Sequence, residues 1–574
     1  MSLQESSRRQ FLRNSAALCG GLSATLNAEP QSIATKTNST HRRSSYLDIV
    51  RQPDAVIAYT DINKPLALTL HSSTWSISDL SVRTEPQQNG AALQLPISLR
   101  SPGTPLAYLH LRWRISSPDN LRILGDHWER SYGDLEWRGH VPDRVMPWYF
   151  LTFDGHETHG YGVMTQPSAL CFWQLDLAGV SLWLDLRNGG NPVELGDRAL
   201  KAATVVSVRG NRDEKPMETA HRLCKTMCPK PRLPQLPFFG SNDWYYAYGH
   251  NTASGILRNA DLIVSVTPNG SSRSCVVVDD GWQDEKRFPD MAGLASEIRT
   301  RNLTPGLWIR PMRAAKSAKQ SLLLPQTRFS KDSGRADLAY DPTIPEALEI
   351  ILDSIRTPVH WGYQYIKHDF STYDIFGRWG SEMGARATLP GWSFSNRTLT
   401  NAEIITSFYR SLRDTAGDNA TILGCNTVGH LAAGLFEAQR IGDDVSGTTW
   451  ERTRRMGVNT LAYRFPQHRT FFCVDPDCIA ITKAVPWSNT KLWLDLVARS
   501  GAALFVSPDP DATGPDQKAA LSEAFSLCAA SSSLANIEDW LDNTAPQTWN
   551  FVGKNSFTRQ YNWCGNNGAN PFQD

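Results

Sequence analysis

The chain has 574 residues, which allows several domains, although a barrel can take up roughly 250 residues as a single unit. Its 58 Lys and Arg residues balance 57 Asp and Glu residues, so almost no net charge exists to attract nucleic acid or an anionic membrane. A neutral substrate fits this balance better. The 19 Trp residues mildly favour a carbohydrate, because aromatic faces stack on sugar rings, although core packing explains most of them.

The N-terminus has the composition of an export signal. Residues 7–13 (SRRQFLR) contain a pair of arginines, and the weakly apolar run 15–26 follows, with the small residue Ala28 behind it. This pattern predicts a twin-arginine signal peptide over residues 1–28. The run is too short and too polar to span a membrane. We therefore expect a soluble protein exported to the periplasm or the extracellular space, with no stable membrane insertion.

The ten cysteines do not indicate a disulfide framework. Their spacing is irregular, and twin-arginine export carries proteins that have already folded in the cytoplasm, so an oxidising destination does not require disulfides. Cys224 and Cys228 lie four residues apart in a predicted helix, with no His or second Cys pair nearby, which argues against a zinc site. The sequence therefore predicts no metal and no cofactor.

The region before residue 230 is predicted to be a linker followed by a β-sandwich. Residues 29–45 are rich in Ser, Thr and Asn, which suits a linker. Over residues 46–230, short alternating runs are separated by Pro, Gly and Asn, which is typical of a β-sandwich. These runs lie at 66–70, 92–99, 106–115 and 181–186. A helix predicted over 217–227 leads into a proline-rich segment, which marks a domain boundary.

Residues 231–515 have a different pattern, in which strand-like runs alternate with stretches of helical period. Eight strands are predicted, at 237–245, 274–282, 304–311, 363–370, 421–426, 436–445, 469–478 and 501–509. Their number and the length of the region fit a (β/α)8 TIM barrel. A doubly wound open sheet competes with this architecture, but no Gly-rich phosphate loop follows the first strand. Residues 516–574 are predicted to be a short C-terminal segment of helix and β-structure.

Acidic residues lie at the predicted carboxyl ends of four barrel strands, which is where barrel enzymes place their chemistry. The four ends have the sequences VDDGW (278–282), KHDF (367–370), RIGDD (440–444) and DPD (475–477). A single acidic residue at a strand end is as often a helix cap, but capping does not easily explain acidic residues at all four ends.

Predicted strands four and six can supply a pair of carboxyl groups across the barrel mouth. Cleavage of an acetal needs one protonated and one ionised carboxyl group. The neighbouring Lys367 would favour the ionised form of Asp369, while a more desolvated carboxyl group on strand six could stay protonated near neutral pH. The carboxylates could instead bind a divalent metal, but the usual His partners are missing apart from His368.

These motifs resemble those of glycoside hydrolase clan D, the α-galactosidases of families 27 and 36 with the related raffinose synthases. Asp279 and Asp280, in the sequence DDGWQ, are similar to the acidic pair on strand two that holds galactose hydroxyls in this family. Lys367 and Asp369 are similar to its Lys-x-Asp motif, which implies that Asp369 is the nucleophile and that Lys367 binds the sugar. The resemblance covers residues 237–510.

The sequence RIGDD resembles the Arg-x-x-x-Asp motif of the same family. It implies that Arg440 contacts the sugar and that Asp444 is the general acid/base. Asp443 is adjacent, and only the spacing of the motif favours Asp444. The family also lines its pocket at the positions of Trp244 on strand one, Trp308 on strand three and Cys425 on strand five, although simple packing explains these three residues equally well.

The N-terminal sandwich also resembles that of family 36, and residues 124–129 (LGDHWE) are predicted to form a loop over the barrel mouth. Some features differ from the family. Strand five has CNTVG in place of a glycine run, which leaves the recognition of the sugar 2-hydroxyl open. Arg310 near the mouth and the long loop 371–400 predict an unusual leaving-group side. The segment after Pro515 is shorter than the C-terminal β-domain of the family, so completion by a partner subunit in a homo-oligomer stays open.

The sequence thus predicts a secreted retaining α-galactosidase that acts on terminal α-galactosyl residues of oligosaccharides or glycoconjugates. One alternative is galactosyl transfer of the raffinose-synthase kind, against which export from the cytoplasm argues. The other is a catalytically silent carbohydrate-binding protein, against which the two intact carboxyl groups argue. The aglycone and the choice between galactose, N-acetylgalactosamine and another sugar with an axial 4-hydroxyl stay open.

Overall fold

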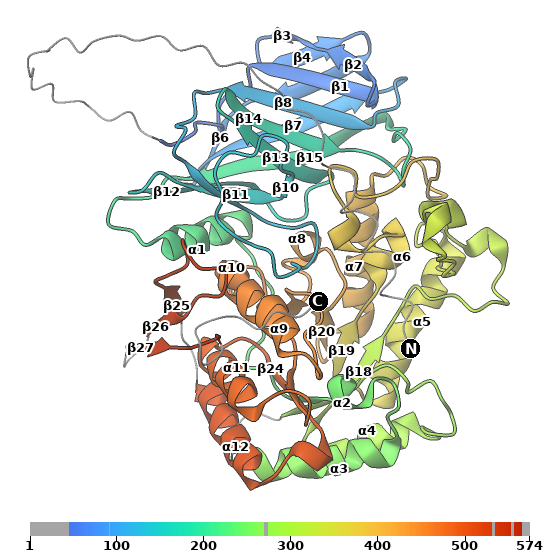
Figure 1. Ribbon diagram of the computed structural model, residues 1–574. Coiled ribbons are helices and arrows are strands. Elements are labelled where there is room, and N and C mark those ends of the chain that lie inside the picture. Colours follow the sequence, from blue (N-terminus) through green and yellow to red (C-terminus); the bar gives the residue numbers. More distant parts are fainter. Residues whose placement is uncertain (1–44, 91, 269–273, 531–533, 553–555, 565–574) are drawn as a thin grey trace, which may run out of the picture. The chain divides into compact units, whose positions relative to one another are not determined.

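Two antiparallel β-sheets make up the N-terminal part of the computed structural model, which describes residues 45–90, 92–268, 274–530, 534–552 and 556–564 (Figure 1). The predicted signal peptide, and the predicted linker apart from Ser45, lie outside the described residues. The six-stranded sheet has the order β10-β13-β14-β8-β1-β2. Its strands are β1 (Ala55–Asp61), β2 (Lys64–Ala67), β8 (Tyr108–Arg114), β10 (Met146–Pro147), β13 (Leu170–Asp176) and β14 (Gly179–Asp185).

The second sheet has the order β3-β4-β5-β7-β15-β12-β11-β9, and β6 pairs with β7 at its side. Its strands are β3 (Thr69–His71), β4 (Thr74–Ile77), β5 (Leu80–Thr84), β6 (Gln87–Asn89), β7 (Ala92–Ser101), β9 (Arg122–Gly125), β11 (Tyr149–Phe153), β12 (Thr158–Val163) and β15 (Gly196–Val208). The two sheets pack against each other, since the rings of Phe150 in β11 and Trp173 in β13 lie 5.6 Å apart. The β-rich N-terminal region is therefore confirmed.

The alternation in the sequence accounts for these strands. In β5 the residues Leu80 and Val82 are buried while their neighbours reach the surface, as expected for a strand with one face on the core. The predicted run 66–70 is divided between β2 and β3, which belong to different sheets. Helix α1 (Pro216–Met227), predicted over 217–227, packs on β12, where Gly160 and Gly162 leave room for Leu223 and Met227.

A parallel sheet forms the second part, in the order β22-β21-β20-β19-β18-β17-β16-β24-β23. Its strands are β16 (Phe239–Asn242), β17 (Cys275–Val278), β18 (Thr304–Ile309), β19 (Tyr365–His368), β20 (Thr421–Gly424), β21 (Ala438–Arg440), β22 (Cys473–Asp475), β23 (Ile479–Ile481) and β24 (Leu504–Pro508). All eight predicted positions contain a strand. The predicted seventh strand, 469–478, contains β22, and β23 begins just after it, with three residues between β22 and β23. All four residues of β17 (CVVV) are buried, as is typical of a parallel sheet covered on both faces.

The parallel sheet is TIM-like. β22 pairs with β21, β23 pairs with β24, and the N–H of Ala503 donates to the carbonyl of Val474 at 2.9 Å, which links β22 to the segment before β24. Asp477, one of the three residues between the two short strands, has φ 78°, so the chain bends there. The predicted seventh strand therefore ends early, at β22, and β23 begins after the bend.

The helices of this part alternate with the strands. The longer ones are α3 (Ala253–Val266), α4 (Met291–Thr300), α5 (Pro345–Trp361), α7 (Asn401–Ala416), α11 (Trp487–Ser500) and α12 (Pro515–Ala530). The short ones are α2 (Trp244–Ala247), α6 (Ser371–Phe376), α8 (Gly429–Ala432), α9 (Trp450–Thr453) and α10 (Thr460–Arg464), with a π-helix at Arg454–Asn459. Helix α7 begins with a capping box between Thr400 and Glu403.

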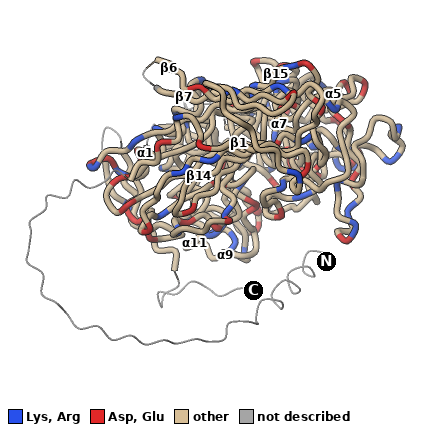
Figure 2. Tube along the Cα trace, turned by 90° about the horizontal axis from the view of Figure 1, so that it is seen from above, with Lys and Arg blue, Asp and Glu red and all other residues tan. Residues whose placement is uncertain are grey.

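After α12 the strands β25 (Leu534–Ile537), β26 (Thr548–Val552) and β27 (Phe557–Gln560) form a small antiparallel sheet. Ser45–Asp574 is one compact unit, so the domain boundaries near residues 230 and 515 stay predictions. Lys and Arg are interspersed with Asp and Glu along the described chain (Figure 2). Within the described ranges, no helix is both long and apolar enough to cross a bilayer. The nine described cysteines are free.

Candidate active site

The predicted acidic residues lie at one edge of the TIM-like sheet. Asp279 and Asp280 directly follow β17, Asp369 directly follows β19, and Asp443 and Asp444 come shortly after β21. These strands are parallel and belong to one sheet, so their carboxyl ends face the same way. In the described part of the chain, no group of three or more His, Cys, Asp or Glu residues could hold a metal ion.

Asp369 is held by three N–H donors. Its Oδ1 accepts from the backbone N–H groups of Phe370 at 2.7 Å and Asn426 at 3.1 Å, and its Oδ2 accepts from Nε1 of Trp308 at 3.0 Å. A carboxyl group that only accepts has the hydrogen-bonding pattern of the ionised form. Phe370 has φ 67°, a conformation that is strained for a bulky residue and that lets its N–H reach the preceding side chain.

Lys367 forms its ion pair with Asp279, and its expected influence on the ionised form of Asp369 stays a prediction. Its Nζ lies 2.7 Å from Oδ2 of Asp279, which also accepts from Nδ2 of Asn242 at 2.6 Å. Burial lowers the pKa of Lys367, but the charge of Asp279 outweighs burial and holds this pKa well above its usual value. Asp279 is 2% exposed, whereas Asp280 is partly exposed. Asp280 is therefore the more accessible member of the pair.

Asp443 and Asp444 have different partners. Oδ1 of Asp443 lies 3.1 Å from Arg130 and its Oδ2 lies 2.9 Å from Arg452. Oδ1 of Asp444 lies 2.9 Å from Arg440 and 3.7 Å from Arg130, and no hydrogen bond from the described residues reaches its Oδ2. The Asp444 side chain is 47% exposed, against 20% for Asp443. Asp444 is thus the acid with an oxygen free for a substrate.

The structure does not support the expectation that desolvation could keep the acid on strand six, Asp444, protonated near neutral pH. Partial burial raises the pKa of this carboxyl group, but the guanidinium groups of Arg440 and Arg130 outweigh burial. Lys367 and Arg452 act in the same direction, so the pKa of Asp444 lies below its usual value. The arginines come from separate parts of the chain, which is why the sequence around Asp444 did not reveal them.

Arg440 is almost completely buried and supports Asp444 from within the barrel. It is 1% exposed, and its guanidinium group also forms an ion pair with Asp477, which accepts from the hydroxyl of Tyr245 as well. Asp477 further accepts from the backbone N–H of Val445 at 2.9 Å. The contact between Arg440 and a sugar stays a prediction. The acidic strand-seven end was visible in the sequence, but its pairing with Arg440 was not.

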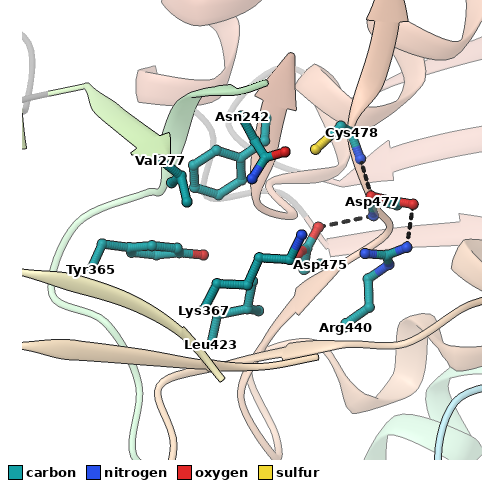
Figure 3. Close-up of a pocket in the computed structure, with 10 residues that line it drawn as sticks. Asn242, Val277, Tyr365, Lys367, Leu423, Arg440, Asp475, Asp477 and Cys478 are labelled. Carbon is teal, nitrogen blue, oxygen red and sulfur yellow. Dashed lines mark hydrogen bonds and ion pairs between the residues drawn. The ribbon is translucent and has the colours of Figure 1, made fainter. Parts of the chain in front are cut away.

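A cavity of about 10 Å³, roughly the space that one water molecule needs, adjoins Lys367 and Arg440 (Figure 3). Asp475 also lines it, and burial raises the pKa of this carboxyl group to about 6. The other lining residues are Asn242, Val277, Tyr365, Leu423, Asp477, Cys478 and Phe505. Polar groups from several strand ends thus surround one small cavity in the interior.

The three predicted pocket residues differ in their placement. Trp308 lies on β18 and contacts Asp369 as described above. Cys425 follows β20, is 1% exposed, and has its Sγ 3.8 Å from Arg440. Trp244 begins helix α2 and is not on strand one, because β16 ends at Asn242. Its backbone N–H donates to Oδ1 of Asn242 at 3.0 Å, so it borders the Asp279 network only through its main chain.

Arg310 is neutralised by acidic partners. Its guanidinium group forms a fork with Asp374, at 3.0 and 2.6 Å, and lies 3.2 Å from Asp337. It also stacks 4.4 Å from the ring centre of Phe370. A groove of about 560 Å³ borders Arg310 and Trp308. The groove is also lined by Trp282, Gln283, Ile309, Arg313, Ala314, Ala315, Asp353, Ser354, Thr357, Pro358 and Trp361.

Of the predicted loop 124–129, Leu124 and Gly125 belong to β9, and the segment that follows them contacts the strand ends and continues beyond residue 129. The backbone of Ser131 pairs with the end of strand six. The N–H of Ser131 donates to the carbonyl of Ile441 at 2.9 Å, and the N–H of Asp443 donates to the carbonyl of Ser131 at 2.8 Å. Glu129 accepts from Nδ2 of Asn426. Sequence reasoning missed Arg130 and Asn426 as site residues. Nothing local distinguishes Arg130, whereas Asn426 could have been found as the polar residue at the end of predicted strand five.

Comparison with known proteins shows the fold. No protein-family model matches the sequence. An α-galactosidase from Thermus thermophilus, solved with p-nitrophenyl α-D-galactopyranoside, is 17% identical, with 84% of this chain and 97% of that chain covered and a TM-score of 0.59. A GH36 α-galactosidase from Geobacillus stearothermophilus, solved with 1-deoxygalactonojirimycin, is 11% identical, with 87% and 76% covered and a TM-score of 0.57. The galactosidase domain of an α-galactosidase-sucrose kinase is 12% identical, with 84% and 71% covered and a TM-score of 0.55.

Proposed function

We propose that this protein is a retaining glycoside hydrolase that releases terminal α-D-galactosyl residues. One observation carries the proposal: two carboxyl groups at the ends of β19 and β21, which flank β20 in the same sheet, have opposite environments. Asp369 is fixed by three N–H donors, and Asp444 is half exposed with one oxygen free. The fold shared with the α-galactosidases supports hydrolysis of α-galactosides. The fold alone does not define the leaving group.

In the proposed mechanism, an oxygen of Asp369 attacks the anomeric carbon while Asp444 donates its proton to the departing glycosidic oxygen. A covalent glycosyl-enzyme forms and the free alcohol leaves. Asp444, now ionised, takes a proton from water, whose oxygen attacks the same carbon and releases Asp369. The sugar leaves with its original anomeric configuration. The mechanism requires the two carboxyl groups to be about 5 to 5.5 Å apart.

Asp280 is proposed to accept hydrogen bonds from sugar hydroxyls, and Lys367, which pairs with Asp279, is proposed as a donor to the sugar. A carboxylate that accepts from two hydroxyls discriminates strongly against an epimer that leaves one unpaired. Structures of neighbours with stachyose and raffinose support an α-galactoside as the substrate class. Export by the twin-arginine route is part of the proposal, and replacement of Arg8 and Arg9 by Lys should leave unprocessed precursor in the cytoplasm.

A panel of aryl α-glycosides, each tested with the purified mature chain, examines this proposal. We expect turnover of the α-galactoside, with α-galactose as the first product seen by proton NMR. First release of β-galactose would overturn retention, and turnover of only another glycoside would overturn the sugar assignment. Oligosaccharide products from an added sugar acceptor would indicate transfer, and binding without turnover would indicate a silent carbohydrate-binding protein.

A further inference from the structure

The loop that follows β9 places two charged residues, Glu129 and Arg130, in the interior at the ends of the barrel strands. The Glu129 side chain is 0% exposed and that of Arg130 is 7% exposed. Burial of a charge is costly unless partners compensate for it. The proposed mechanism uses neither residue, so their partners show what they do.

Arg130 contacts both members of the Asp443–Asp444 pair. Its guanidinium group lies 3.1 Å from Asp443 and 3.7 Å from Asp444, and it stacks 5.6 Å from the ring centre of Trp379. Together with Arg452 it engages both oxygens of Asp443. Arg130 thus keeps the neighbouring acid occupied and brings a positive charge to Asp444.

Glu129 reaches the other carboxyl group through one intermediate residue. It accepts from the side chain of Asn426 and from the backbone N–H of Gly380 at 2.9 Å. The backbone N–H of Asn426 in turn donates to Oδ1 of Asp369 at 3.1 Å. Adjacent residues of one loop therefore connect to both catalytic carboxyl groups.

The backbone of this loop is fixed against the barrel. Ser131 pairs with Gly442 as a parallel bridge, one residue from Asp443. Gly133 has φ 69°, and a Cβ atom there would lie 2.6 Å from the carbonyl oxygen of Arg455, so only glycine allows this approach. The loop is thereby held in one position relative to the strand-six end.

We propose that Arg130 and Glu129 are positioning residues for the two catalytic carboxyl groups, so that the N-terminal sheets complete the active site. Arg130 sets the orientation and charge state of Asp444, and Glu129 holds Asp369 through Asn426. The roles of the two carboxyl groups rest on the proposed function. The contacts of the loop do not.

The charged and titratable groups that face Asp444 determine what loss of Arg130 should do. Besides Arg130 they are Arg440, Asp443, Lys367, Arg452, Tyr245 and Tyr248. Arg130 is one of the cations that hold the pKa of Asp444 below its usual value. A general acid acts only while it is protonated, so activity is lost as the pH rises through its pKa. Without Arg130 this pKa rises, and activity should extend to higher pH.

The test compares Arg130→Met, Arg130→Lys and a matched control, Arg122→Met, which removes an arginine from the preceding strand, where it pairs with Asp542. For each, kcat/KM is measured against pH with an aryl α-galactoside that has a poor leaving group. We expect the basic limb to move up by about 1 pH unit in Arg130→Met, the low end of the effect of one opposite charge, because Asp444 is half exposed. In Arg130→Lys and in Arg122→Met the basic limb should stay at its wild-type pH. A lower kcat and melting temperature with an unmoved basic limb would reduce Arg130 to a structural role and overturn the proposal.

Glu129→Gln tests the proposal that Glu129 holds Asp369 in place. It should lower kcat by the same factor for good and poor leaving groups and leave KM unchanged, because it disturbs the nucleophile and not the acid. An unchanged kcat would overturn the role of Glu129.

A second measurement does not depend on activity. Melting temperatures of the wild type, Arg130→Met, Asp444→Asn and the double variant give the coupling between the two residues. We expect non-additivity of about 1 °C or more at pH 7 that becomes smaller as the pH is lowered and Asp444 takes up a proton. Additive effects at pH 7 would overturn the Arg130 proposal even in an active enzyme. Coupling in a protein that hydrolyses no glycoside would support the contact and overturn only the proposed function.

Discussion

The two sides of the candidate site hold the same kind of side chain by different forces. On the β19 side, backbone and indole N–H groups fix Asp369, and these groups are dipoles of constant strength. On the β21 side, guanidinium groups surround Asp444, which is half exposed. Dipoles fix geometry, whereas full charges act mainly on the protonation state. The difference is consistent with the proposed roles, in which Asp369 stays ionised as nucleophile and Asp444 exchanges a proton.

The largest expected effect is the loss of Asp369. Asp369→Gly should lower turnover of every substrate by about 10⁴-fold or more, because no covalent intermediate can form. Added azide should restore part of the activity and give β-galactosyl azide, since azide attacks from the face that the carboxylate occupied. Steady-state rates and NMR of the azide product measure this. An α-configured azide would exchange the roles of the two sides.

Asp444→Gly should be sensitive to the leaving group, which Asp369→Gly is not. Loss of a general acid costs about 10² to 10⁴-fold, and an activated aryl group departs without protonation. We therefore expect a large fall in kcat/KM with poor leaving groups, a small one with dinitrophenyl galactoside, and an α-product with azide. Asp443→Gly is the matched control, because Arg130 and Arg452 already engage Asp443. Leaving-group dependence in Asp443→Gly alone would move the acid/base by one residue.

Local patterns in the sequence were sufficient to predict the strands and the acids that follow them. A strand such as CVVV followed by Asp-Asp predicts both a buried strand and a polar end. The partners of those acids could not be predicted, because Arg130 comes from the loop after β9 and is distant in sequence. Lys367 was expected to influence Asp369, the acid two residues away in the sequence. In the structure it pairs with Asp279, which follows β17, two strands away in the sheet.

The two acids that follow β17 also differ in their environments. Asp279 is buried and pairs with Lys367, while Asp280 is partly exposed. Asp279→Asn should destabilise the protein by about 3 to 5 kcal/mol, because it leaves the buried lysine charge uncompensated. Asp280→Asn should leave the melting temperature nearly unchanged and raise KM for the galactoside. Melting curves and KM values of both variants measure this. A stable Asp279→Asn protein with weakened sugar binding would mean that Asp279 contacts the sugar itself.

The smallest expected effect sharpens the β19 side of the comparison. Trp308→Phe keeps most of the ring volume and removes the side-chain donor to Asp369 found among the described residues, while the backbone donors from Phe370 and Asn426 remain. A single hydrogen bond to a charged acceptor contributes about 1.5 to 3 kcal/mol, which corresponds to roughly 10 to 100-fold in rate if the bond acts fully in the transition state. Two other hydrogen bonds keep the carboxylate in place. We therefore expect kcat to fall by about 10-fold, the lower limit of this range, and by the same factor for good and poor leaving groups. A leaving-group-dependent fall would mean that Trp308 acts on the departing group, and an unchanged kcat would mean that the two backbone donors suffice to hold Asp369.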